Sequence, residues 1–144
     1  MGSGDIVTVK IQGADQLQRK LEELRLNVAK KFVRQALKAG SQPIQELMVQ
    51  LAPRDTGFLA EHFGTKISAR GQEISGQAFI GPQGKVLYPN RPKGKSRSVA
   101  TIARFLEFGT SRMAPRAFMT QAFENGKYTA LNRIIETLKR ILGV

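Results

Sequence analysis

The 144-residue chain has no cysteine and no tryptophan, and it contains a single histidine, His62. Disulfide frameworks need paired cysteines, and structural zinc sites are built from clustered cysteine and histidine side chains. The sequence therefore offers neither a disulfide scaffold nor a zinc cluster. We expect a protein that carries no metal and no cofactor.

Long apolar runs are also absent. A membrane-spanning helix needs roughly 18 to 20 consecutive apolar residues, and no stretch of this chain approaches that length. The N-terminus lacks the apolar core of a signal peptide, so no membrane partner is expected. The length is typical of one domain with its own core, so residues 1–144 are predicted to form a single domain, with residues 1–4 as a tail of no structural weight.

Acidic residues are scarce: 11 of them face 23 lysines and arginines, which gives a formal charge of +12. Such an excess favours contact with a polyanion or with an acidic protein surface, without choosing between them. The excess is concentrated in residues 81–116, where Glu107 is the one acid. The eight basic residues there are Lys85, Arg91, Lys93, Lys95, Arg97, Arg104, Arg112 and Arg116.

Two amphipathic stripes dominate the rest of the chain. Residues 7–11 alternate as a short strand does, and Asp15 with Gln18 resembles the capping box of a helix. Apolar residues then recur at helical spacing as far as Leu51, which predicts a helix of about 35 residues with a bend near Pro43, where Gly40 and the proline weaken it. Beyond Phe118 a second helical stripe runs from Ala122 to Leu142, interrupted at Asn125-Gly126, and it predicts a C-terminal helix.

The segment between the two stripes predicts smaller elements. Residues 64–80 read as a β-hairpin turning near residues 70–72, with Ile74 in its second strand, and residues 81–98 as a mobile basic loop. Residues 99–106 return to helical spacing, and Gly109 stands where a capping glycine ends a helix. The predicted fold is α+β: a long kinked N-terminal helix and a C-terminal helix packed against a small antiparallel sheet, with a long basic loop.

The motifs that resemble catalytic signatures lack the context that catalysis needs. Asp55-Thr56-Gly57 has the tripeptide of aspartic proteases, but a long helix and Pro53 precede it in place of a hydrophobic strand, so a structural turn is favoured. Gly94-Lys95-Ser96 would need a glycine at position 89 to form a phosphate-binding loop, and that position holds Pro89. His62 has no partner for metal binding or catalysis. The chain is predicted not to be an enzyme.

The basic segment leaves nucleic-acid binding open. Lysines and arginines gain affinity for a duplex by releasing its counterions, with no need for base-specific contacts. Tyr88 is the one aromatic residue among these charges, and helix-turn-helix, zinc-finger and RNA-recognition signatures are absent. A sequence-nonspecific nucleic-acid-binding protein is therefore the alternative reading, and its candidate contacts to DNA or to an acidic partner are Lys85, Arg91, Lys93, Lys95 and Arg97.

Three motifs in this order resemble one protein family. They are Ala36-Leu37-Lys38-Ala39-Gly40, then Ala52-Pro53-Arg54-Asp55-Thr56-Gly57-Phe58-Leu59, then Leu106-Glu107-Phe108-Gly109-Thr110-Ser111 followed by Met113 and Phe118. From about Leu17 to Phe123 the chain resembles the head-to-tail joining proteins, or neck and tail-completion proteins, of long-tailed bacteriophages. Members of that family usually have a further proline just before the phenylalanine that corresponds to Phe118, where this chain has Ala117.

The resemblance implies a virion structural protein without catalytic residues. It would assemble as a homo-oligomeric ring between the head connector and the tail, with other connector and tail proteins as partners. It would be found in the neck or tail of the virion, and in the host cytoplasm during assembly. Nonspecific contact with packaged DNA would fit the same place.

Particular residues receive roles on this hypothesis. Asp55, Thr56 and Gly57 would form a turn, and Gly109 would end a helix in a left-handed conformation so that residues 110–115 project as a docking loop. Glu107 would pair with Arg104, Arg112 or Arg116. The full set predicted for assembly is Arg104, Glu107, Phe108, Gly109, Thr110, Arg112, Met113, Arg116 and Phe118.

Overall fold

A computed structural model of the chain describes residues 19, 20, 22, 24–54, 57–70, 74–89 and 97–143. The strand predicted at residues 7–11 and the capping pair Asp15 and Gln18 lie outside the described residues. Within the described part, no helix is long and apolar enough to cross a membrane.

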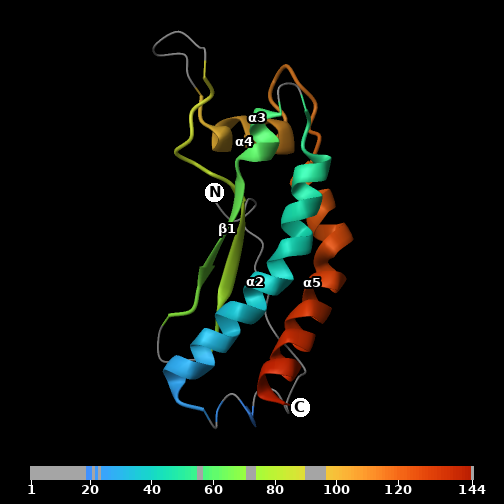
Figure 1. The fold of residues 1–144 in the computed structure, drawn as a ribbon. Coiled ribbons are helices and arrows are strands. Elements are labelled where there is room, and N and C mark those ends of the chain that lie inside the picture. Colours follow the sequence, from blue (N-terminus) through green and yellow to red (C-terminus); the bar gives the residue numbers. More distant parts are fainter. Residues whose placement is uncertain are drawn as a thin grey trace.

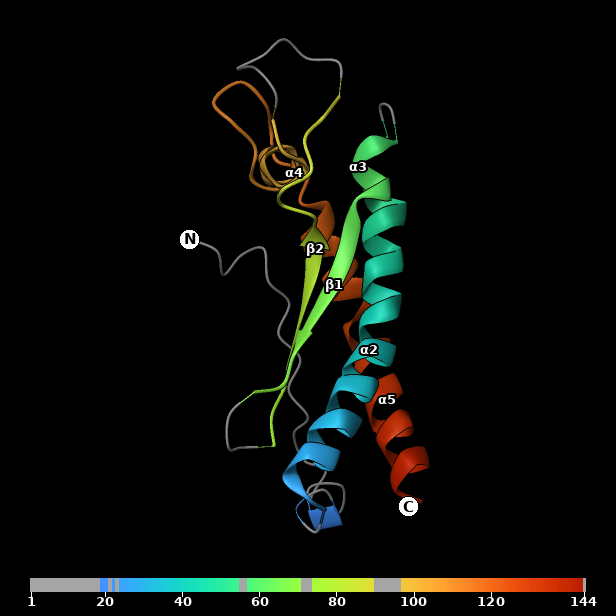
Figure 2. The same ribbon diagram turned by 60° about the vertical axis from the view of Figure 1, so that its left-hand side comes forward.

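Two long helices form the length of the molecule. Helix α2 (Leu26–Leu51) and helix α5 (Phe118–Leu142) lie side by side and run in opposite directions, and a two-stranded sheet packs beside them (Figures 1 and 2). The short helices α3 (Phe58–Glu61) and α4 (Val99–Phe108) gather at the end where α2 stops and α5 starts. Helices packed against a small antiparallel sheet confirm the predicted α+β class.

Helix α2 is shorter than predicted at its start and continuous through its proline. Arg25 has an extended backbone, with φ −60° and ψ 137°, so α2 begins at Leu26 and spans 26 residues. The apolar stripe runs on across this break, which is why spacing alone predicted a longer helix. Pro43 is buried within the helix, and Figure 2 shows the two halves of α2 inclined to one another.

Two glycines allow α2 and α5 to approach closely. A Cβ atom on Gly40 would lie 2.4 Å from Cγ1 of Ile134 and 2.9 Å from the carbonyl oxygen of Ala130. A Cβ atom on Gly126 would lie 3.0 Å from Cδ1 of Leu47. The apolar stripe of the C-terminal helix is interrupted at Asn125-Gly126, but α5 runs through this position, where the missing side chain of Gly126 provides a contact surface for α2.

The predicted hairpin is confirmed. Strands β1 (Phe63–Ser68) and β2 (Gln77–Pro82) pair antiparallel, with Phe63 opposite Pro82 and Ser68 opposite Gln77. Ile74, which was expected in the second strand, precedes it. The hydroxyl of Thr65 donates a hydrogen bond of 2.6 Å to Oε1 of Gln45, so a polar contact ties the sheet to α2.

The core consists of two clusters along the paired helices. One lies beneath α3 and α4, where the rings of Phe63 and Phe118 meet edge to face at 5.8 Å. The other lies towards the opposite end, where Leu37 and Leu138 pack with Ala78 of the sheet. The first cluster fixes the small helices onto the scaffold and so positions the candidate site.

Candidate functional site

The predicted assembly residues gather at one end of the molecule. We call this the apical end, and it comprises residues 57–62, 83–89 and 97–117, that is, α3, α4 and the segments that flank α4 (Figure 1). Five predicted residues lie outside the described residues, and nothing is added for them: Asp55, Thr56, Arg91, Lys93 and Lys95.

Helix α4 is delimited at both ends by local chemistry. Its N-cap Ser98 accepts a hydrogen bond of 3.1 Å from the backbone amide of Thr101. It ends at Gly109, which has φ 75° and ψ 177°. The positive φ was predicted, but the ψ is extended, in a region that only glycine occupies readily and that differs from the predicted left-handed helical one.

A side chain at position 109 would also collide with the loop that follows. A Cβ atom there would lie 2.7 Å from the carbonyl oxygen of Met113 and 2.9 Å from Cδ of Pro115. The chain after it folds back on itself, because Thr110 and Met113 exchange backbone hydrogen bonds of 2.8 and 3.3 Å. The amide of Arg116 then donates to the carbonyl of Leu106 at 2.7 Å. Residues 109–117 are therefore a folded loop held against α4.

Glu107 joins this loop to the helix that follows. Its side chain is 2% exposed, and Oε2 accepts a hydrogen bond of 2.8 Å from the backbone amide of Met119. Oε1 accepts from the backbone amide of Thr120 at 3.0 Å and from the hydroxyl of the same residue. The carboxylate thus caps the first turn of α5, where free amides and the helix dipole favour negative charge.

The ion pair predicted for Glu107 was wrong. Within the described part of the chain, its two oxygens are occupied by donors of α5, and none of Arg104, Arg112 or Arg116 is its partner. The sequence carried only a partial signal for the observed role. Ala117 before α5 has no side chain that could cap the helix, so its first amides are open to an acceptor from elsewhere, but the sequence does not say which one.

Ala117 stands where the sequence resemblance led us to expect a proline. It has φ 43° and ψ 39°, and it is the non-glycine residue with positive φ in the described part of the chain. Proline holds φ near −65°, so it could not adopt this backbone. The turn into α5 in this chain therefore follows a path that a proline at position 117 would forbid.

The outer surface of the apical end combines apolar and basic side chains. Phe108 is 53% exposed and Leu87 is 58% exposed. Lys85, Arg97, Arg104, Arg112 and Arg116 are also exposed, and the guanidinium of Arg97 lies 5.4 Å from the centroid of the Phe105 ring. Because Glu107 is buried, no carboxylate of residues 83–89 and 97–117 faces solvent.

The base of the predicted mobile loop is ordered. Tyr88 donates a backbone hydrogen bond of 3.0 Å to Arg97, and Val99 donates one of 2.8 Å to Val86, so the two ends of the 81–98 segment pair with each other. The ring of Tyr88 lies 4.7 Å from that of Phe58. Tyr88 is the aromatic residue that the sequence placed among the basic charges, and its ring packs on Phe58 within the protein.

Gly57 and His62 have structural roles at α3. Gly57 has the left-handed values φ 78° and ψ −8° and caps α3, in the segment where the sequence predicted a turn. Nδ1 of His62 lies 2.7 Å from the carbonyl oxygen of Phe58, and its ring lies 4.2 Å from the Phe58 ring. These contacts give His62 a packing role against Phe58.

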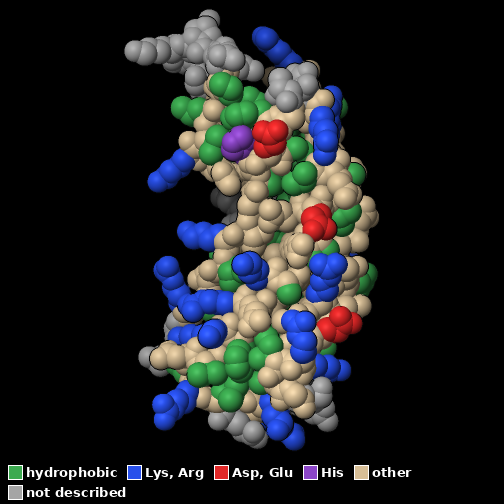
Figure 3. Space-filling view, viewed as in Figure 1, with side chains coloured by type: hydrophobic (Ala, Val, Ile, Leu, Met, Phe, Trp, Pro, Cys, Tyr) green, Lys and Arg blue, Asp and Glu red, His purple; other side chains and the backbone are tan. Residues whose placement is uncertain are grey.

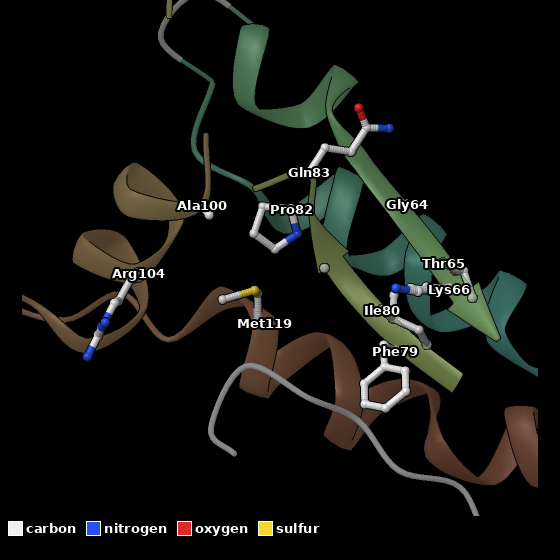
Figure 4. Close-up of a pocket in the computed structure, with 11 residues that line it drawn as sticks. Gly64, Thr65, Lys66, Phe79, Ile80, Pro82, Gln83, Ala100, Arg104 and Met119 are labelled. Carbon is white, nitrogen blue, oxygen red and sulfur yellow. The ribbon is translucent and has the colours of Figure 1, made fainter. Parts of the chain in front are cut away.

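A cleft of about 510 Å³ opens beside the apical end, between the hairpin, α4 and the start of α5 (Figure 4). Its lining residues are Gly64, Thr65, Lys66, Phe79, Ile80, Gly81, Pro82, Gln83, Ala100, Arg104 and Met119. The lining contains no carboxylate and no histidine, so it offers no general acid or base of those kinds. Among the described residues, no three His, Cys, Asp or Glu side chains gather as a metal site would require.

Comparison with known families decides the relationship. The family model described as "Bacteriophage HK97-gp10, putative tail-component" matches residues 15–109. The chain belongs to the HK97-gp10-like family. No curated protein and no solved structure matches it.

The match confirms the family resemblance seen in the sequence. The family comprises bacteriophage tail components and is not a known class of enzymes, so this HK97-gp10-like chain is a structural tail component found in the virion. The matched segment contains all of α2, α3 and α4 and ends at Gly109. The amides that Glu107 caps belong to α5, beyond the matched residues.

Proposed function

We propose that this tail component joins the phage head connector to the tail, as a neck or tail-completion protein that assembles as a ring around the DNA channel. The observation that carries the proposal is the apical end, where an exposed phenylalanine stands beside arginines on a loop held firmly to two helices. The whole chain acts in this proposal as one domain, made in the host cytoplasm and retained in the virion.

The surface chemistry of the apical end suits a protein partner. Aromatic residues and arginine are enriched at protein interfaces, and the residues that dominate binding energy are drawn largely from them. Phe108 supplies an apolar anchor, while Arg112 and Arg116 lie on the loop that follows it. A neighbouring connector or tail subunit with an apolar pocket rimmed by carboxylates would complement this surface.

The loop geometry lowers the cost of binding. A segment that is already ordered loses less conformational entropy when it docks than a mobile one does. Gly109 and the hydrogen bonds of residues 110–116 fix the loop before any partner arrives. A ring then repeats this surface around one axis, so many weak contacts act together.

The basic segment between β2 and α4 has a place in the same assembly. Lys85, Arg91, Lys93, Lys95 and Arg97 would form a positive collar when they are repeated around the ring. The collar would face an acidic neighbouring ring or the DNA in the channel. Joining requires no catalytic residue, no cofactor and no membrane.

The proposal is tested by reconstitution of heads and tails. Replacing Phe108 with Asp should reduce joined particles at least tenfold in an electron-microscopy count. The melting temperature should fall only slightly, because about half of the side chain is already in solvent and a negative charge at the end of α4 costs about 0.3–1 kcal/mol. Tyr128, which is 72% exposed on α5, provides the control, and Tyr128→Asp should join normally. Normal joining by Phe108→Asp, or purified protein that forms no ring alone or with tails, would contradict the proposal.

A further inference from the structure

Among the described residues, the largest cluster of positive charge lies at the end of the molecule opposite the apical end. Residues 24–45, which hold the first five turns of α2, contain no acidic residue and five basic ones: Arg25, Lys30, Lys31, Arg34 and Lys38. The antiparallel arrangement sets the C-terminal half of α5 beside them, and the guanidinium of Arg34 donates to the carbonyl of Ala69 at the far end of the hairpin at 2.9 Å. Three elements therefore meet there.

We call this the basal end, and it comprises the described residues among 19–38, residues 69–70 and residues 133–143. It carries eleven basic residues and two acidic ones, Glu22 and Glu136, while Glu23 and Glu73 lie outside the described residues. Figure 3 shows lysine and arginine side chains gathered over the lower half of the molecule, with few carboxylates among them. The basic residues are Arg19, Lys20, Arg25, Lys30, Lys31, Arg34, Lys38, Arg70, Arg133, Lys139 and Arg140.

The charges on α2 do not stabilise the helix. Lys31, Arg34 and Lys38 share one exposed face at spacings of three and four residues, where like charges destabilise a helix by about 0.2–0.5 kcal/mol per pair. In the described part of the chain, neither Lys31 nor Lys38 has a carboxylate within ion-pair distance. By contrast, Lys139 and Arg140 lie in the last turn of α5, where the helix dipole favours them.

Figure 3 shows a small apolar patch among the basal lysines and arginines, but its side chains are only modestly exposed. The exposed large hydrophobic residue of the basal end in the described ranges is Val28, at 39%, and no exposed aromatic side chain lies there. Interfaces with nucleic acid are more polar and much more positively charged than interfaces between proteins. The two ends therefore differ in chemistry: the apical end combines arginines with Phe108 and Leu87, each more than half exposed, whereas the basal end has more cations and, among its described residues, no exposed aromatic side chain.

We propose that the basal end binds the phosphate backbone of duplex DNA without reading its sequence. Rows of cations along two adjacent helices complement an extended polyanion with regularly repeated charge, and release of counterions supplies the affinity. This surface is separate from the basic loop of the apical end. The proposal goes beyond head-to-tail joining and does not rest on it.

The test measures binding of the full chain to a fluorescent duplex of arbitrary sequence, about 30 bp long, by anisotropy across a salt series. The basal variant combines Lys31→Gln, Lys38→Gln and Arg133→Gln. The control variant combines Arg54→Gln, Lys66→Gln and Lys127→Gln, which lie outside the basal end, the basic loop and the predicted assembly residues, so that both variants lose the same charge. For the basal variant, the slope of log K against log salt should fall in magnitude by about 2–3, because each lost phosphate contact removes roughly 0.9.

The control variant should keep the wild-type slope. Equal losses in both variants would overturn the proposal, because net charge would then explain the binding. So would binding that is the same in the basal variant as in wild type, or selective capture of poly-glutamate with no affinity for the duplex, which would assign the surface to an acidic protein. A variant with Lys31→Arg and Lys38→Arg should bind as wild type does, and circular dichroism should show native helix content in every variant.

Discussion

Removing the Glu107 carboxylate should lower the free energy of unfolding of the whole domain. The residue lies in the last turn of the short helix α4, but its side chain caps the long helix α5. In Glu107→Ala, the amide of Met119 loses its acceptor at a buried site, and an unsatisfied buried donor costs about 1–3 kcal/mol. Loss of a helix N-cap costs about 0.5–2 kcal/mol. Since the amide of Thr120 is partly accessible to water, we expect a total near 3 kcal/mol.

Such a loss is large against the roughly 5–15 kcal/mol by which a domain is stable, and it should lower the melting temperature by about 10 °C. Glu107→Gln should cost less, about 1–2 kcal/mol, because one oxygen remains while the new amide group faces a backbone donor. Thr120→Val removes the hydroxyl donor alone and should cost about 1 kcal/mol.

Urea unfolding followed by circular dichroism gives the free energies, and an unchanged m-value shows that the native state is otherwise preserved. The control is Glu124→Gln, which removes an exposed pair in which Lys127 Nζ lies 2.7 Å from Glu124 Oε2. Glu124 raises the pKa of Lys127 through this hydrogen bond, yet such surface pairs add little stability. If Glu107→Ala proved as mild as Glu124→Gln, the capping role would be refuted.

Backbone geometry yields three further predictions, each measured by urea unfolding. Gly109→Ala should cost about 2–4 kcal/mol, and clearly more than Gly57→Ala, because both have positive φ but a Cβ atom collides with backbone only at residue 109; equal costs would refute the collision. Gly40→Ala should cost about 1–3 kcal/mol despite the higher helix propensity of alanine, since the helices must separate, and a stabilised variant would show that α2 and α5 are less closely packed. Ala117→Gly should stabilise the protein by about 0.5–1 kcal/mol through relief of its positive φ, whereas a loss would argue against that conformation.

The elements with strong periodicity could be predicted from the sequence. Apolar spacing reveals the helices α2 and α5 and the hairpin, and Gly109 marks the end of α4. The boundaries that failed depend on tertiary contact. The break at Arg25 leaves the apolar stripe unchanged on both sides, so spacing alone could not predict it. The role of Gly126 was also beyond the sequence, because it depends on the close approach of α2.

The sequence predicted which residues form the candidate site but not how they are hydrogen-bonded to one another. The sequence placed Phe108, Gly109 and the arginines in one segment, and the structure keeps them together at the apical end. It could not assign Glu107, because the acceptor and the amides it serves are 12 and 13 residues apart and no local rule links them. The basal end was missed for a related reason: its charges come from three separate segments that only the antiparallel packing unites.

The carboxylate of Glu107 gives the loop of residues 109–117 an unusual mechanical character. The loop leaves one helix beside this side chain and enters the next helix at the amides that the same side chain binds. The side chain of Glu107 therefore connects the two ends of the loop directly. A force applied to the loop would therefore act on α4 and α5 together. Because α5 packs closely against α2 at Gly40 and Gly126, the force would be shared by both long helices.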